Sequence, residues 1–250
     1  MESIDYTDIK KMNQLVDLLL LNGTLVECPG LIHGKMGIVI FFFHYADYTK
    51  NDFFEDYALD LITEIKAQIH SNSPADYENG LAGIGVGFDY LLRNNFLQIG
   101  EPFYKDLDKR MYRAVMYDPW QDFSLYDGLA GYGQYWLFRM NDSNVSSHTK
   151  ECLSHFIKLI EENIDGMSEK EQSDVYRLMF ELNNNGVKTD RLNSYFVKNP
   201  IENNYNAGDL SKKFNVENLD KMGLLNGCAG QGMAYLSRLA PQYKSWIKLL

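Results

Sequence analysis

Four short glycine clusters in this chain are each preceded by a polar side chain. The clusters span residues 34–37, 80–83, 128–131 and 227–230. The residues immediately before them are His33, Asn79, Asp127 and Asn226. An imidazole or a carboxylate in such a position can transfer protons, and all four side chains can line a binding pocket. Asn and Asp are also good helix caps, so capping is the alternative interpretation. Histidine is a poor cap, which makes His33 the strongest candidate for a functional side chain.

Further candidates flank the second and third clusters. Asp76 stands four residues before Gly80 and is a candidate proton-transfer carboxylate. The alternative for Asp76 is a turn or cap role, which the composition favours because the residue follows a Ser-Pro pair. Asp76 or Glu78 could also pair with Asp127, as glycoside hydrolysis requires two carboxylates about 5–9.5 Å apart. Tyr126 adds an aromatic side chain of the kind that lines peptide or sugar sites.

Two of the three cysteines are candidates for a metal site. Cys28 and Cys228 lie at opposite ends of the chain, close in sequence to the first and last glycine clusters. If those ends meet in space, Cys28, His33 and Cys228 could bind one metal ion. The alternative is that both are unrelated buried cysteines, as free cysteines often are.

The spacing of the clusters predicts a repeat architecture. Their first glycines, at positions 34, 80, 128 and 227, are 46, 48 and 99 residues apart. A period in the forties is typical of repeat folds, and the double gap predicts a decayed copy near residue 177. Equivalent positions of such repeats share one face, so the residues beside the glycines are expected to lie together.

Two kinds of helix are expected in each repeat. The segments that follow the glycines, residues 38–48, 84–93, 132–140 and 231–239, are apolar on nearly every side, as in a helix buried all round. The segments between them show apolar residues at spacings of three and four, most clearly over residues 52–69, which predicts amphipathic surface helices. Residues 38–43 alone could be a β-strand, but the equivalent segments predict a helix.

Inner buried helices with amphipathic helices outside them predict an all-α toroid of helical hairpins, a single domain over residues 1–250. An open solenoid is the alternative. We expect the glycines to allow close approach of the inner helices and a left-handed turn of the backbone. Residues 183–221 are rich in Asn, Lys and Asp and have poor periodicity apart from 191–197, so we expect an insertion or irregular segment there.

Bulk composition limits the kind of partner. The net charge of −10, with dispersed Lys and Arg, disfavours nucleic acid and anionic membranes. No apolar stretch approaches the ~20 residues of a membrane span. Three cysteines cannot build a disulfide framework, and the first residues lack the features of a signal peptide. A cytoplasmic protein is expected.

The glycine clusters resemble those of one known family. HGKMGI at 33–38, NGLAGIG at 79–85, YDGLAGYG at 126–133 and GLLNGCAGQG at 223–232 are similar to the lanthionine synthetase C-like family, as is the ending GMAYLSRL at 232–239. The resemblance covers about residues 28–240 and implies the α/α toroid of the cyclases. It also implies a chemistry in which zinc, held by two cysteines and one histidine, activates a peptide thiolate that adds to a dehydrated Ser or Thr. Asp76 matches an acidic position of the family.

The zinc ligands of the family are not matched. His33-Gly34 corresponds to part of its Cys-His-Gly motif, but Ile32 stands in place of the cysteine. The other ligand cysteine lies two residues before a glycine, and here those positions hold Ile32, Glu78, Tyr126 and Leu225. Zinc is therefore not assigned as a cofactor from the sequence.

Three functions follow as expectations. The first is a cyclase-like protein of peptide modification, either catalytic or a peptide-binding relative without zinc. The second is a carbohydrate-active enzyme using Asp76 and Asp127. The third is a non-catalytic scaffold whose exposed apolar edge is covered by a partner protein or a second copy.

Overall fold

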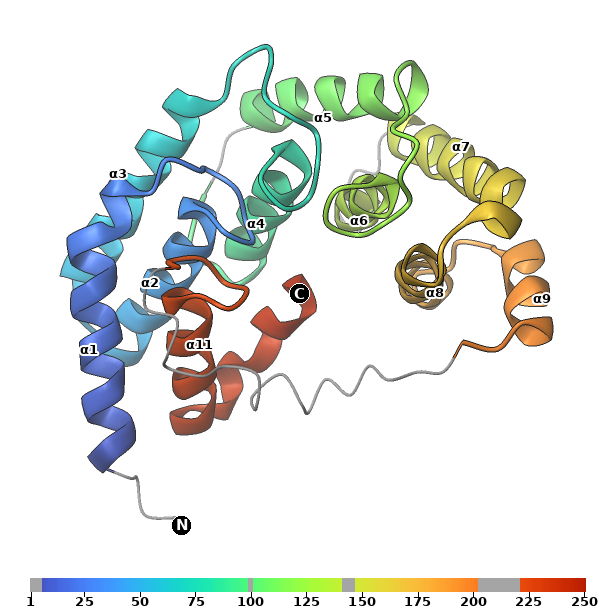
Figure 1. Cartoon of the computed structure of the whole chain (residues 1–250). Coiled ribbons are helices and arrows are strands. Elements are labelled where there is room, and N and C mark those ends of the chain that lie inside the picture. The colour runs from blue at the N-terminus through green and yellow to red at the C-terminus, as the bar shows by residue number, and fades with distance from the viewer. Residues whose placement is uncertain (1–5, 99–100, 141–146, 202–220) are drawn as a thin grey trace. The chain divides into compact units, whose positions relative to one another are not determined.

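Figure 1 shows the computed structural model of the chain, which describes residues 6–98, 101–140, 147–201 and 221–250. Those residues form helices and no strand, as the sequence predicts. The helices that follow the glycine clusters are α2 (Lys35–Thr49), α4 (Leu81–Arg93), α6 (Leu129–Met140) and α11 (Cys228–Leu239). The amphipathic helices between them are α1 (Tyr6–Asn22), α3 (Asp52–Gln68), α5 (Glu101–Met116) and α7 (Ser147–Asn163). The remaining elements are α8 (Glu169–Asn184), α9 (Asp190–Lys198) and the 3-10 segments η1 (Gly23–Leu25), η2 (Ile164–Gly166) and η4 (Pro241–Leu249).

The predicted contrast between buried and amphipathic helices is confirmed. Every residue of α2 from Lys35 to Ala46 is buried, and so is every residue of α4 from Leu81 to Leu91. Helix α3 instead buries four residues, all on one face: Ala58, Leu61, Ile62 and Ile65. The apolar run over residues 38–43 lies inside α2, so its helical interpretation is correct and the strand alternative is wrong.

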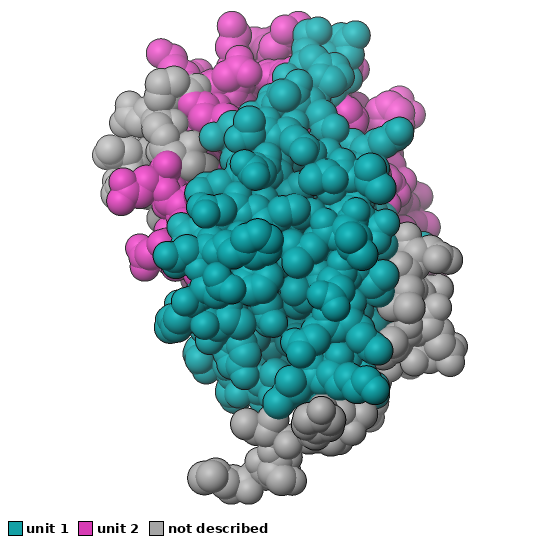
Figure 2. Space-filling view, turned by 90° about the vertical axis from the view of Figure 1, so that its left-hand side faces the viewer, with its two compact units in different colours: residues 1–73, 205–250 teal, residues 74–204 magenta. Residues whose placement is uncertain are grey.

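The chain divides into two compact units, shown in different colours in Figure 2. Unit 1 comprises residues 1–73 and 205–250, and so contains both ends of the chain. Helix α11 packs against α1 and α2, α3 packs along α2, and η4 returns against α11. The N-terminal and C-terminal helices are therefore neighbours.

Unit 2 comprises residues 74–204. Helix α6 is its central element, since it contacts α4, α5, α7 and α8. Helix α9 packs on α8. The sequence predicts a single domain over residues 1–250. Whether the two units form one domain is not tested, so the single domain stays a prediction.

The reason for the glycines differs in part from the expectation. A left-handed turn is not what they provide: Gly34, Gly80 and Gly227 have extended φ values of −114°, −107° and −126°. A Cβ on Gly34 would lie 2.5 Å from the carbonyl oxygen of Cys28, and one on Gly80 would lie 2.4 Å from that of Pro74. Close approach of the loop to its own backbone is therefore what requires these glycines.

The expected decayed repeat near residue 177 falls within α8. This helix begins without a glycine cluster, at a capping box in which Ser168 and Glu171 bond each other's backbone N–H. In the segment 183–221, α9 covers the periodic residues 191–197, and residues 202–220 lie outside the described part of the chain.

No helix within the described ranges is both long and apolar enough to cross a membrane.

Candidate functional site

Each glycine cluster is preceded by a loop that closes on itself through the same backbone hydrogen bond. The N–H of the first helical residue donates to the carbonyl seven residues earlier in all four loops. These bonds are Lys35 to Cys28 (2.8 Å), Leu81 to Pro74 (2.9 Å), Leu129 to Asp122 (2.8 Å) and Cys228 to Lys221 (2.8 Å). One donor that the helix itself cannot satisfy is thereby paired, and the loop is held over the helix N-terminus.

The loops are also bonded to one another in pairs. In unit 2 the backbone N–H groups of Tyr77 and Glu78 both donate to the carbonyl of Tyr126, at 3.0 Å each. We call residues 74–80 and 122–128 the acidic loop pair. In unit 1 the N–H groups of Leu224 and Leu225 donate to the carbonyl of Ile32, at 2.8 and 3.1 Å. We call residues 28–34 and 221–227 the histidine loop pair.

Carboxyl groups gather on the acidic loop pair. The Asp76 Oδ1 accepts the backbone N–H of Asn79 at 2.7 Å, which fixes this carboxylate within its loop. Partial burial raises the pKa of Glu78, and the charge of Asp127 and a hydrogen bond to it raise that pKa further. Because two adjacent carboxylates repel each other, Glu78 takes up a proton more readily beside Asp127 than it would alone. The pair joins a half-buried residue of one loop to an exposed residue of the next.

A buried tyrosine borders these carboxyls. Tyr132 lies on the first turns of α6 and is 6% exposed. Burial, and after it the nearby charge of Asp76, raises the pKa of Tyr132 to about 12, so its hydroxyl stays protonated at neutral pH. The acidic loop pair thus combines negative charge with a phenol that can donate a hydrogen bond.

The histidine loop pair has different chemistry. Partial burial lowers the pKa of His33, and the positive charge of Lys221 on the neighbouring loop lowers it further. Asn226 is exposed and holds the left-handed φ of 55°. A Cβ on Gly223 would lie 2.5 Å from the His33 Cα, so the two loops touch through their backbones. His33 is therefore a neutral imidazole beside a cation at pH 7.

The expected site residues are thus divided between the two units. Asp76, Asn79, Tyr126 and Asp127 belong to the acidic loop pair, whereas His33 and Asn226 belong to the histidine loop pair. Capping does not explain the residues before the glycines of α2, α4 and α11, since the N-cap of each helix is the glycine itself. The catalytic and binding roles expected for these residues stay predictions.

The described residues do not bring the expected zinc donors together. Among them, no three His, Cys, Asp or Glu side chains are placed to hold one metal ion, and Cys28, His33 and Cys228 form no such group. Cys228 is fully buried at the start of α11, and the Cys28 Sγ lies 3.4 Å from the backbone nitrogen of Gly30 and accepts its N–H. Ile32, at the position of a family ligand, has a fully buried apolar side chain. These residues do not fit a zinc centre.

The contact of Glu78 with Asp127 is one of the carboxylate pairings expected from the sequence. Two other contacts of unit 2 were not expected. Asp174 on α8 accepts the N–H of Leu125 through Oδ2 at 2.9 Å, and Glu171 accepts that of Phe123 at 3.0 Å. The carboxylate of Asp174 thus takes the place that a neighbouring loop carbonyl has in the two loop pairs. The capping box at Ser168 was the available signal for where this helix starts.

A comparison with family models gives one match. The model described as "Lanthionine synthetase C-like protein" matches residues 26–175, which include the first three glycine clusters. No curated protein matches the chain. No solved structure matches it either.

Proposed function

Because the chain belongs to the lanthionine synthetase C-like family, we propose that it takes part in peptide modification as a cyclase-like protein that binds a peptide without the family's zinc. The observation that carries this proposal is the acidic loop pair, which lies within the matched segment and carries the carboxyls of Asp76, Glu78 and Asp127, with the buried Tyr132 near Asp76. The peptide it fits carries positive charge, from Lys, Arg or a free amino terminus. The cytoplasm, which the cysteine content favours, is the proposed location.

Binding rather than thioether formation is the better-supported role. A cysteine thiol has a pKa of about 8.5, whereas carboxyl groups titrate near 4. Even with its raised pKa, a carboxylate such as Glu78 is a weak base toward a thiol. Since the described residues do not fit a zinc centre, nothing in the site compensates for that weakness.

The toroid remains part of the proposal. Its support is that the last glycine loop is bonded to the first one, through Leu224, Leu225 and Ile32. The packing of α11 against α1 adds to it, because a closed ring of hairpins must join its two ends.

For the carbohydrate-active alternative, the hydrogen bond between Glu78 and Asp127 argues against these two as the carboxylates of hydrolysis, which lie about 5–9.5 Å apart. The pair of Asp76 with Asp127 stays a prediction.

The test is fluorescence anisotropy of the full chain with the labelled peptide Gly-Lys-Ser-Cys-Lys-Gly. We expect saturable binding, weakened about tenfold in the double variant Glu78→Gln/Asp127→Asn, since two charges near a cation are lost. Asp165→Asn is the matched control, because Asp165 is an exposed carboxylate in η2. Equal affinity of the double variant and the wild type would show that the acidic loop pair is not the site.

The thiol is tested in the same assay. Replacing the cysteine of the probe by serine is expected to leave the affinity unchanged, with and without added zinc. A zinc-dependent gain confined to the cysteine probe would contradict the proposal and restore a metal-bound thiolate.

A further inference from the structure

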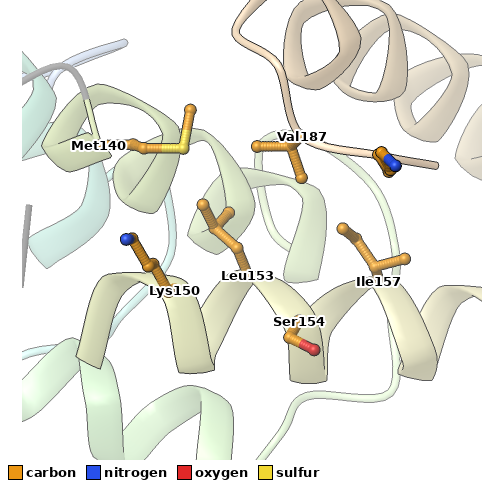
Figure 3. Close-up of a pocket in the computed structure, with 7 residues that line it drawn as sticks. Met140, Lys150, Leu153, Ser154, Ile157 and Val187 are labelled. Atoms are coloured by element: carbon orange, nitrogen blue, oxygen red, sulfur yellow. The ribbon is translucent and has the colours of Figure 1, made fainter. Parts of the chain in front are cut away.

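A hollow on the surface of unit 2 is lined by residues that belong to neither loop pair. Its floor is apolar and comes from Leu153 and Ile157 of α7, Met140 at the end of α6 and Val187 after α8. Figure 3 shows these side chains converging from three segments of the chain. The volume is about 270 Å³, just below the range of pockets that enclose a drug-sized molecule. The hollow therefore suits a few side chains of a larger ligand.

Two lysines accompany this apolar floor. Lys150 and Lys188 line the hollow and are exposed. Neither forms an ion pair within the part of the chain that the structure describes, although other charges on α7 do. Lys158 pairs with Glu162 at 3.7 Å, and Glu161 pairs with Arg191 at 3.8 Å. In a chain of net charge −10, two exposed lysines at one apolar hollow are complementary to an anionic ligand.

We propose that this hollow docks an acidic peptide segment in which aliphatic side chains are flanked by carboxylates. The aliphatic side chains would pack on Leu153 and Ile157, and the carboxylates would face Lys150 and Lys188. The exposed hydroxyl of Ser154, which also lines the hollow, is a hydrogen-bond donor for the peptide backbone. This site does not depend on the acidic loop pair and carries the opposite charge.

The expected contribution of the lysines is modest. Exposed ion pairs are weak and are screened by salt, so the two together are expected to change the affinity about tenfold at low ionic strength. The aliphatic contacts supply the remainder and do not respond to salt in this way.

The experiment uses the full chain and the labelled peptide Gly-Glu-Leu-Leu-Glu-Gly in a fluorescence anisotropy titration at two salt concentrations. Lys150→Gln/Lys188→Gln is expected to weaken binding about tenfold and to remove most of the salt dependence. Val187→Trp is expected to abolish binding by filling the hollow, since Val187 points into it (Figure 3). Lys158→Gln is the matched control, since Lys158 lies on the same helix, is exposed and pairs with Glu162. Circular dichroism checks that each variant is folded.

The outcomes separate the alternatives. Equal binding of a probe with lysines in place of its glutamates, or equal affinity of the double-lysine variant, would overturn the proposal. So would the absence of binding at millimolar peptide. Displacement of the probe by micromolar octanoate would assign the hollow to a lipid anion and would overturn the proposal of a peptide ligand. Failure of the cationic probe at the acidic loop pair would leave this result unaffected, because the two probes and variants differ.

Discussion

The acidic loop pair and the histidine loop pair are bonded through the same backbone positions but present different side chains. In each pair, one loop donates two backbone N–H groups, from the second and third residues before its glycine. Both bonds go to one carbonyl of the other loop, at the residue two before that loop's glycine. That carbonyl belongs to Tyr126 in one pair and to Ile32 in the other. Around it lie the carboxyls of Asp76, Glu78 and Asp127 in unit 2, but a neutral His33 beside Lys221 in unit 1.

This difference shows that the glycine motif specifies backbone geometry and not chemistry. The hydrogen bonds of both loop pairs use main-chain atoms, so the side chains beside them are free to vary. A buried isoleucine can therefore occupy a position where the family has a metal ligand, without altering the loop. Family membership is therefore compatible with described residues that do not fit a zinc centre.

The largest expected effect comes from removing a shared glycine. A Cβ on Gly34 or on Gly128 would lie 2.5 Å from backbone atoms, which cannot move away as a flexible side chain can. We expect Gly34→Ala and Gly128→Ala each to lower the free energy of unfolding by about 3 kcal/mol or more, as overpacking against backbone does. Urea unfolding measures both losses.

Gly166→Ala is the control for this pair, because nothing lies within 4 Å of its added Cβ and its φ is not positive. We expect it to change stability by no more than about 1 kcal/mol. A mild effect of Gly34→Ala alone would mean that the two loop pairs are not equivalent, contrary to their hydrogen bonding.

The repeat explains how much of this was predictable. The segment over residues 38–43 favours a strand by composition, and only its equivalence to the other post-glycine segments predicts the helix that α2 forms. The period does not predict where α8 begins, because it puts a glycine cluster near residue 177 whereas α8 starts at Glu169 after Ser168. Helix type follows from local pattern, which is why it could be predicted.

Contacts between loops distant in sequence could not be predicted in this way. The glycine positions put Glu78 and Asp127 among the expected carboxylate pairs, but their direct contact depends on how the two loops are aligned, which nothing in either loop alone specifies. The bond from Leu125 to Asp174 spans 49 residues and uses a side chain where the other loops use a carbonyl. The expected left-handed glycines were wrong because local sequence does not show which atoms a loop approaches.

The next largest effect is the pH dependence of stability, which should differ between the units. Each unit buries a titratable group, and burial shifts the two pKa values in opposite directions. His44 in α2 is 1% exposed, and burial lowers its pKa to about 4. The contribution of His44 to the free energy of unfolding is fully present above the unfolded-state pKa near 6.5. It is lost as the pH falls toward 4, and the loss is about 3 kcal/mol. For Asp174 in α8, burial raises the pKa of the carboxyl group. Its contribution to the free energy of unfolding therefore increases as the pH falls.

Urea unfolding at pH 7 and pH 4.5 tests this contrast. His44→Gln is expected to reduce the loss of stability on acidification, and Asp174→Asn is expected to increase it. If both variants change the pH dependence in the same direction, the assignment of opposite signs is wrong.

A smaller effect is expected where a side chain replaces a loop carbonyl. Asp174→Leu leaves the buried N–H of Leu125 without its acceptor and should cost about 2 kcal/mol. Asp174→Asn retains an oxygen at that place and should cost less than half as much at pH 7. Equal costs in urea unfolding would show that the carboxylate acts through its charge and not as a substitute for the carbonyl.

The smallest effect concerns Asp76, the position at which the loops differ most. Its carboxylate accepts the N–H of Asn79, whereas the equivalent residues of the two histidine loops, Gly30 and Gly223, have no side chain. Asp76→Gly therefore makes this loop like its counterparts, and we expect a loss of about 1 kcal/mol in urea unfolding. Asp76→Asn keeps an acceptor oxygen and should be nearly neutral for stability. If Asp76→Asn nevertheless weakens binding of the lysine-containing peptide several-fold, the carboxylate acts on the ligand as well as on the turn. Unchanged binding would leave Asp76 as a turn residue and confine the site to Glu78 and Asp127.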